Sequence, residues 1–313
     1  MGHALAANKA IRNYGQHAVR CAFVTAPSVG TPSSASTPAV PSHWPRLSDW
    51  LAVTLHRDPT HHWLEARLPA ANRESAALLV AAHIARVRCG GAPQYFDAWL
   101  ARLAGGPPHP ADLLECLVAL VASESIGMPP DGASDEHIEG FVAEHIWHLL
   151  TLEDALTFGV PVRVDEPDWS VTDSGGDGLA IYRWNGALVF RLWESKAHTG
   201  EGTVRDVVNG ACRQVNSNAL RYLARFSKVG QGLGDPELQQ FYGRLLELWR
   251  AAAREAGGGI SVTTKSDAIA DCFGNYPSYW AFVHDDQRQG LVVTIEDYAA
   301  FAKQVRQGLW KGL

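Results

Sequence analysis

Apolar positions recur with the period of an amphipathic helix along much of the first half of the chain. Asn72 can cap a helix that runs to Arg88, because apolar side chains repeat there at intervals of three and four residues. Further helices are predicted over 95–103 and 111–123. We therefore expect residues 44–130 to form a helical N-terminal region.

The second half mixes helical patterns with short strands. Helices are predicted from 134 or 135 to about 150 and over 203–226, 235–257 and 296–309, and strands as a pair within 178–194, at 260–264, and as a hairpin-like pair at 280–284 and 291–294. This alternation is typical of an α/β domain, in which helices flank a central mixed sheet. We assign the domain to residues 131–313.

The N-terminal segment has a different composition. The first 48 residues contain no Asp or Glu, and 26–42 consist of Pro, Ser, Thr, Ala, Gly and Val. Because such a composition cannot easily bury a core, we expect residues 1–43 to be a flexible tail or linker. An acid-poor leader with Arg and Ser also fits an organelle transit peptide, and this alternative stays open.

Composition and charge narrow the class of protein. With 313 residues, 46% hydrophobic and 19% charged, the chain can bury a substantial core. No apolar run reaches the roughly 18 to 20 residues of a membrane span, and we expect a soluble, cytoplasmic protein. The net charge of −6 disfavours bulk electrostatic coating of nucleic acid but permits a local basic groove. Five cysteines without a Cys-x-x-Cys pair disfavour a disulfide framework and a zinc knuckle.

The strongest local signal is a hairpin centred on Asn185-Gly186. Both residues tolerate positive φ, and runs of β-branched, aromatic and aliphatic residues flank them. If they form a two-residue turn, Trp184 faces Ala187. The residue numbers of every further cross-strand pair then have the same sum. A bulge or a longer loop would shift this register. The two-residue turn places Asp177 directly opposite Glu194.

Two carboxylates in opposed positions require a neutralising partner. Cβ atoms of directly opposed residues lie about 4.5 to 5.5 Å apart, and like charges there destabilise a sheet. Lys196 points to the same side as Glu194, because side chains alternate along a strand. Oxygen ligands of this number suit Mg²⁺ or Mn²⁺. The hairpin therefore predicts a divalent metal site that also accepts a substrate phosphate.

A basic helix follows the hairpin. Its cations Arg213, Arg221, Arg225 and Lys228 share one stripe, and Gln214 belongs to a neighbouring row. Because the helix begins soon after Lys196, the stripe can hold a nucleic-acid backbone that leads to the metal. The alternative is an ordinary solvated helix face.

The order of these residues and elements resembles that of a known protein family. A helix with a glutamate, a strand that starts with Asp, a hairpin, Glu-x-Lys and a second helix resemble the PD-(D/E)XK nuclease superfamily. The segments Gly176-Asp177-Gly178-Leu179 and Leu192-Trp193-Glu194-Ser195-Lys196 are most similar to the Hachiman (HamA-like) anti-phage effector nucleases. The resemblance covers about residues 135–230 and implies a restriction-endonuclease-like core.

The resemblance implies roles for individual residues. Asp177 and Glu194 would bind the metal together with the Ser195 carbonyl, and Lys196 would orient or deprotonate the attacking water. Glu144 matches the helical glutamate of the family best, as a further catalytic residue and metal ligand, and Glu139 is the alternative. Gln214 resembles a glutamine that many of these nucleases carry on the following helix.

The function predicted from these observations is Mg²⁺-dependent hydrolysis of DNA phosphodiester bonds. By the resemblance, the chain would be the effector of a bacterial anti-phage defence system and would be restrained by a helicase partner. Two alternatives stay open at this point, a catalytically silent nuclease-fold interaction subunit and a stand-alone restriction-type endonuclease.

Overall fold

One mixed sheet organises the molecule. The computed structural model describes residues 45–122, 126–127, 137–153, 159–167 and 177–313. Its strands are β1 (Ala52–Asp58), β2 (His61–Leu68), β3 (Arg163–Val164), β4 (Gly178–Trp184), β5 (Ala187–His198), β6 (Gly258–Thr264) and β7 (Arg288–Ile295). They form a seven-stranded sheet in the order β1-β2-β7-β6-β5-β4-β3, in which β2, β7, β6 and β5 are parallel neighbours and the other pairs are antiparallel.

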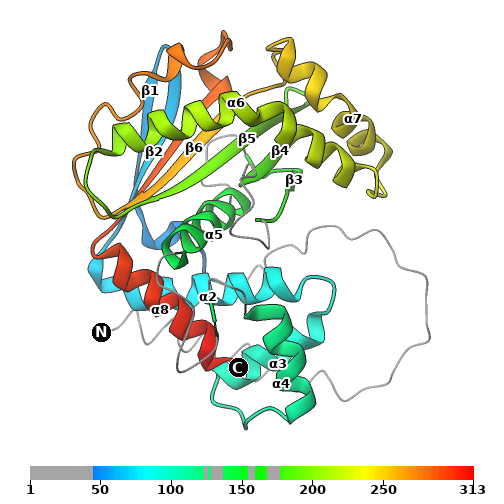
Figure 1. Ribbon diagram of the computed structural model, residues 1–313, viewed down its shortest axis with the longest axis vertical. Helices are drawn as coiled ribbons and strands as arrows, with labels where there is room; N and C mark the ends of the chain where they lie inside the picture. The colour runs from blue at the N-terminus through cyan, green and yellow to red at the C-terminus, as the bar shows by residue number, and fades with distance from the viewer. Residues whose placement is uncertain (1–44, 123–125, 128–136, 154–158, 168–176) are drawn as a thin grey trace.

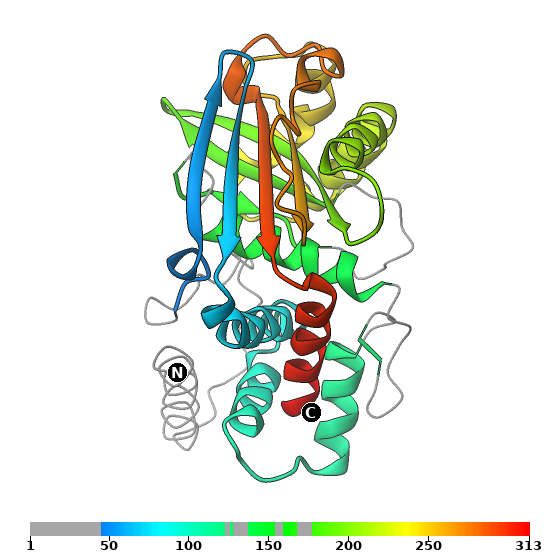
Figure 2. The same ribbon diagram turned by 90° about the vertical axis from the view of Figure 1, so that its left-hand side faces the viewer.

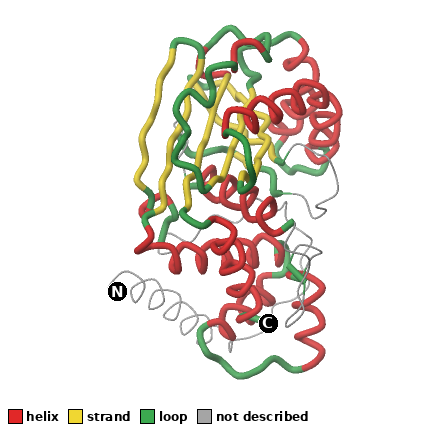
Figure 3. Tube along the Cα trace, turned by 60° about the vertical axis from the view of Figure 1, so that its left-hand side comes forward, coloured by secondary structure: helices red, strands yellow, loops and turns green. Residues whose placement is uncertain are grey.

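Helices cover the sheet on both faces. They are α2 (Arg73–Cys89), α3 (Pro93–Leu103), α4 (Ala111–Val121), α5 (Ile138–Leu152), α6 (Val204–Gly230), α7 (Pro236–Arg250) and α8 (Tyr298–Lys311). The helices α6 and α7 lie over one face (Figures 1 and 3), and α5 packs on the other. Figure 2 shows α8 continuing from the end of β7 into a group with α2, α3 and α4 beyond one end of the sheet. The expectation of an α/β fold with a mixed, helix-flanked sheet is confirmed.

The prediction that residues 44–130 are helical is wrong for the first part of that region. Residues 52–58 and 61–68 form β1 and β2, and β2 pairs in parallel with β7. The buried positions of β2 include Leu64, Ala66 and Leu68, so its pattern has the period of a half-buried strand. The sheet therefore extends across the boundary that we placed at residue 130.

Two other predictions in the second half need correction. Residues 280–284 form no strand, and β7 pairs in parallel with β6 and β2 instead of forming a hairpin. Phe282 is buried by aromatic packing, with its ring centroid 5.0 Å from that of Trp249, so its apolar character reflects side-chain packing. The helix predicted to end at 257 ends at Arg250.

Parts of the predicted organisation lie outside the described residues. These parts are the tail or linker at 1–43 and the breaker sequence at 128–132. Among the helices that the structure describes, none combines the length and the apolar character needed to cross a bilayer.

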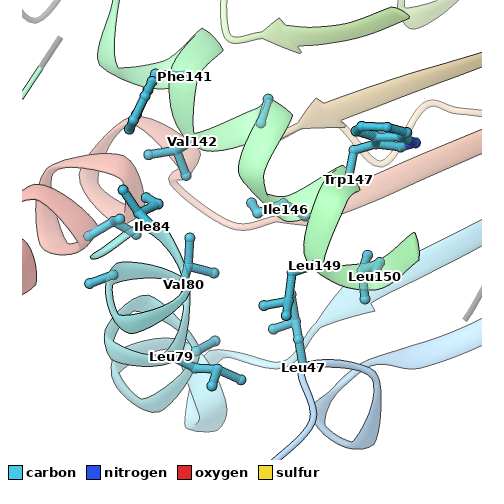
Figure 4. Close-up of a cluster of buried hydrophobic side chains, with 14 of the residues drawn as sticks. Leu47, Leu79, Val80, Ile84, Phe141, Val142, Ile146, Trp147, Leu149 and Leu150 are labelled. Carbon is cyan, nitrogen blue, oxygen red and sulfur yellow. The ribbon is translucent and has the colours of Figure 1, made fainter. Parts of the chain in front are cut away.

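The larger hydrophobic core joins α5 to α2 and the sheet (Figure 4). Val80 and Ile84 of α2 face Val142 and Ile146 of α5 within one buried cluster. Trp147 of α5 is fully buried and lies against Trp193 of β5, with ring centroids 5.8 Å apart. This packing fixes α5 against the strand that carries Glu194.

Gly178 is a position where α5 packs tightly against the sheet. A Cβ atom at Gly178 would lie 2.0 Å from the Trp147 ring. We expect Gly178→Ala to lower the free energy of unfolding by about 1–3 kcal/mol, because the rigid ring must move. Gly243→Ala is the matched control, since Gly243 lies in α7 with open space around it and should gain about 0.5–1 kcal/mol. Chemical denaturation measures both, and equal stability of the two variants would contradict the close packing.

Three histidines form a polar cluster inside the α2–α5 interface. His83, His145 and His148 are almost completely buried, and the distance from His83 Nε2 to His148 Nδ1 is 3.0 Å. Burial lowers the pKa of all three imidazoles, to about 3 for His148, and the neighbouring Arg86 and Arg88 act in the same direction. The folded protein therefore holds this cluster neutral.

The histidine cluster predicts loss of stability in mild acid. Because the pKa values in the folded state lie below the ordinary 6.5, the stability that neutral histidines contribute is complete above pH 6.5 and is lost as pH falls toward the folded pKa. The expected slope is up to about 1.4 kcal/mol per pH unit for each histidine. Thermal unfolding from pH 7.5 to 5 measures it. His148→Gln should flatten the slope and the exposed-site control His137→Gln should not; a pH-independent wild type would contradict the prediction.

Candidate functional site

The β4–β5 hairpin has the register that the sequence predicts. Asn185 and Gly186 both have positive φ, 49° and 83°, and form the two-residue turn. Trp184 pairs with Ala187, and the pairing continues without a bulge to Gly178 opposite Trp193. Asp177 directly precedes Gly178, and continuation of the same register places it opposite Glu194.

Asp177, Glu194 and Lys196 come together at this end of the hairpin. The Ser195 backbone N–H donates to Asp177 Oδ2 at 2.5 Å. The Glu194 side chain is fully buried, and its Oε1 accepts from Lys196 Nζ at 2.6 Å. Glu194 lies on the sheet face that α6 covers, because its strand neighbour Leu192 belongs to the core beneath α6.

One oxygen of the buried glutamate is unsatisfied. Within the described part of the chain, Glu194 Oε2 has no hydrogen-bond partner, although its solvent-accessible area is close to zero. A buried carboxylate oxygen without a partner costs free energy. The atom thus marks a position where a cation or a proton would be stabilised.

The electrostatics of the site also favour a cation. Burial, and next the neighbouring Asp177 carboxylate, raise the pKa of Glu194 to about 8, whereas Lys196 lowers it. Burial disfavours the charged form of Lys196, but the Glu194 and Asp177 carboxylates outweigh it and raise the pKa of that ammonium. The raised pKa of Glu194 means that the acid pair takes up a proton when no other cation is present, because Lys196 alone does not balance both carboxylates in their ionised form.

The two helical acids occupy different environments. Glu144 of α5 contributes to the field that raises the Lys196 pKa, so its carboxylate lies close enough to act on the site. Glu139 accepts a hydrogen bond from Thr199 Oγ1 at 2.6 Å, and its backbone carbonyl accepts one from Tyr298 at 2.6 Å. The Glu139 side chain is therefore hydrogen-bonded to a residue just beyond the end of β5. Of the two acids, Glu144 is the one whose charge acts on Lys196, whereas Glu139 bonds to Thr199.

Gln214 approaches the site instead of the exposed stripe. Its Nε2 donates to Glu194 Oε1 at 2.6 Å and lies 3.4 Å from the hydroxyl of the buried Tyr222. These contacts do not favour the prediction that Gln214 binds nucleic acid, because its amide instead holds the carboxylate of Glu194. The stripe itself is exposed as expected, and consists of Arg213, Arg221, Arg225 and Lys228.

Helix periodicity already places Tyr222 in the row of Gln214, whereas sequence reasoning missed the supporting hydroxyl of Thr199. Tyr222 lies eight residues after Gln214, a spacing of about two helical turns that places both on neighbouring positions of α6. That spacing is a usable signal. Thr199 has no such signal, because its contact with Glu139 depends on how α5 packs against the end of β5.

The donors present fit a hard divalent cation that shares its coordination with water and substrate. Among the described residues, no three His, Cys, Asp or Glu side chains gather closely enough to hold a metal by themselves. Mg²⁺ commonly uses one or two carboxylates and completes its octahedron with waters and substrate phosphates. Asp177 and Glu194 supply two carboxylates, and the Ser195 carbonyl is a further oxygen on the same strand. The lack of a hydrogen-bond partner for Glu194 Oε2 agrees with this ligand set.

The described residues show how this arrangement could act chemically. It joins an acid pair, an ammonium that donates hydrogen bonds, and an exposed basic helix face.

Comparison of the sequence with models of known protein families gives no match, and comparison with curated proteins gives none either.

Proposed function

We propose that the chain is a Mg²⁺- or Mn²⁺-dependent nuclease that hydrolyses DNA phosphodiester bonds at the β4–β5 hairpin. The observation that carries this proposal is the buried, unsatisfied Oε2 of Glu194 beside Asp177, with Lys196 Nζ 2.6 Å from the other oxygen of the same carboxylate. A surface ion pair gives no reason to bury a carboxylate oxygen without a partner, whereas a bound cation would compensate it.

Each residue has a distinct task in this proposal. Asp177, Glu194 and the Ser195 carbonyl would hold the ion, which supplies Lewis-acid stabilisation of the phosphate charge when bound. Lys196 is a hydrogen-bond donor that can orient water for in-line attack. Glu144 adds negative charge from α5, and Gln214 fixes the rotamer of Glu194. Gln214 therefore acts as a positioning residue.

The order of elements around the site supports a restriction-endonuclease-like core. The helix α5 with Glu144 precedes β4, which begins directly after Asp177. The strand β5 carries Glu-x-Lys, and α6 follows and covers the same face. This is the order on which the resemblance to PD-(D/E)XK nucleases rests.

Cleavage of plasmid and linear DNA by the purified protein tests the proposal. We expect nicking or degradation with Mg²⁺ or Mn²⁺, complete inhibition by a chelator, and recovery when metal is restored. An RNA substrate of the same sequence shows which nucleic acid is preferred. No cleavage of either polymer with any divalent metal, by a protein that is folded and free of bound inhibitors, would refute the activity.

The exposed stripe on α6 predicts salt-dependent DNA binding. Replacing Arg221, Arg225 and Lys228 with Gln should weaken binding and lower the slope of log K against log salt by about 2 to 3, since each neutralised phosphate contributes about 0.9. Three exposed cations elsewhere give the matched control when changed to Gln: Arg57, Lys303 and Lys311. Fluorescence anisotropy with a catalytically inactive protein measures both, and equal slopes would show that the stripe is a solvated face.

The proposal also includes a helicase partner and a defence role, which the family resemblance alone supports. Co-purification with the product of a neighbouring gene tests it. A free monomer that degrades DNA without restraint would contradict a restrained complex and favour a stand-alone endonuclease. A protein that binds a partner but never cleaves would favour a silent interaction subunit.

A further inference from the structure

A small recess lies beside β5, away from the residues of the proposed nuclease site. It has a volume of about 200 Å³ including its opening to solvent, and it is lined by parts of β1, β2, β5 and β7. His62, Gln289 and Trp193 provide its polar groups. The first two face each other in the β2–β7 register, and Gly259 of β6 separates Gln289 from Trp193.

The absence of a side chain at Gly259 makes room for the Trp193 ring that lines the recess. The Trp193 ring lies over this glycine, where a Cβ atom would approach the ring within 2.4 Å. A side chain at position 259 would force the ring to move. Gly259 therefore sets the position of the ring that forms one wall of the recess.

The polar groups that line the recess lack partners. Gln289 is 3% exposed, and neither Oε1 nor Nε2 of its amide has a hydrogen-bond partner in the described structure. The indole Nε1–H of the fully buried Trp193 is also unpaired with respect to the described residues. Buried polar groups are almost always hydrogen-bonded, to protein or to ordered water. Three unsatisfied atoms around one recess indicate a bound molecule.

The mouth of the recess is polar and accessible. His62 Nε2 lies 2.9 Å from Asp285 Oδ2, and the His62 side chain is 20% exposed. A water occupies roughly 30 Å³ in the liquid, so the recess has room for water but little for larger ligands once its open part is discounted. Gln289 offers both a donor and an acceptor, which matches the hydrogen-bonding capacity of water.

We propose that this recess holds an ordered water molecule that accepts a hydrogen bond from the Trp193 indole and bonds to the Gln289 amide. The water links β7 to β5 across Gly259 and so supports the strand position immediately before Glu194. This binding site is separate from the metal site and does not depend on the proposed nuclease activity.

Magnetisation transfer from bound water to indole N–H groups tests the proposal on the full chain. We expect a strong water cross-peak to one indole N–H, identified by its loss in Trp193→Phe. Gln289→Met should abolish that cross-peak and shift the same resonance, because the amide partner of the water is gone. Gln231→Met is the matched control, since Gln231 is exposed at the end of α6 and should leave the resonance unchanged.

A crystal structure of the wild-type protein provides the second measurement and does not depend on the folding of a variant. Electron density for a water within hydrogen-bonding distance of Gln289 and Trp193 is the expected result. An empty recess, or a Gln289 amide that bonds to protein groups instead, would overturn the proposal. A Trp193 cross-peak that persists unchanged in Gln289→Met would also overturn it.

Discussion

Glu194→Gln is expected to abolish metal-dependent DNA cleavage, with a loss of at least about 100-fold, because several kcal/mol of transition-state stabilisation depend on a correctly held ion. Glutamine keeps the shape of the side chain and an acceptor for Lys196 and Gln214. It removes the charge and places an amide group where Oε2 now lies without a partner. The effect should therefore be chemical, with the fold retained.

The same substitution should stabilise the metal-free protein at high pH. The pKa of Glu194 is raised to about 8 in the folded state from an ordinary 4.5, so the stability that its proton contributes is present at low pH and is lost as pH rises through 8. Glutamine has no proton to lose. We expect the variant to gain stability relative to wild type between pH 5 and 8.5, by roughly 1.4 kcal/mol for each pH unit of the shift.

Two measurements separate these effects. Thermal unfolding in chelator follows the pH dependence, and cleavage of plasmid DNA in Mg²⁺ follows the activity. Glu201→Gln is the control, because Glu201 is an exposed acid shortly after the same strand. A variant that cleaves DNA at the wild-type rate would remove Glu194 from the metal site, and an unchanged stability profile would show that Glu194 ionises normally.

The part of the site that could be predicted from sequence is the part that local geometry determines. Asn185-Gly186 sets a two-residue turn, and a turn of that kind fixes every cross-strand pair as far as Gly178 and Trp193, directly beside Asp177 and Glu194. The alternation of side chains then places Lys196 on the face of Glu194. These inferences need no knowledge of the rest of the chain.

The parts that sequence could not show depend on contacts between distant segments. The strand β2 becomes part of the sheet through parallel pairing with β7, and no local pattern reveals that partner. Similarly, the stripe on α6 and the row of Gln214 are neighbouring faces of one helix, and only the packing of α6 on β5 decides that Gln214 meets Glu194. Helix periodicity predicts which residues share a face but not what that face contacts.

Lys196→Met should reduce cleavage by about 100-fold or more while retaining metal binding, because Asp177 and Glu194 remain and only the donor that orients water is lost. Lys196 also lowers the pKa of Glu194, so its removal raises that pKa further above 8. Since a metal binds the ionised carboxylate, the affinity for Mn²⁺ should be weaker than wild type at pH 7 and recover at pH 9.

Calorimetric titration with Mn²⁺ at the two pH values distinguishes this role of Lys196 from that of a metal ligand. Lys265→Met is the matched control, because Lys265 is an exposed lysine directly after β6. Loss of metal binding at both pH values would show that Lys196 is needed to form the ion site itself, because ionising Glu194 at pH 9 would then not restore binding. Binding that recovers at pH 9 without recovery of cleavage would assign the ammonium to the attacking water, because the ion is then in place and only the positioned donor is missing.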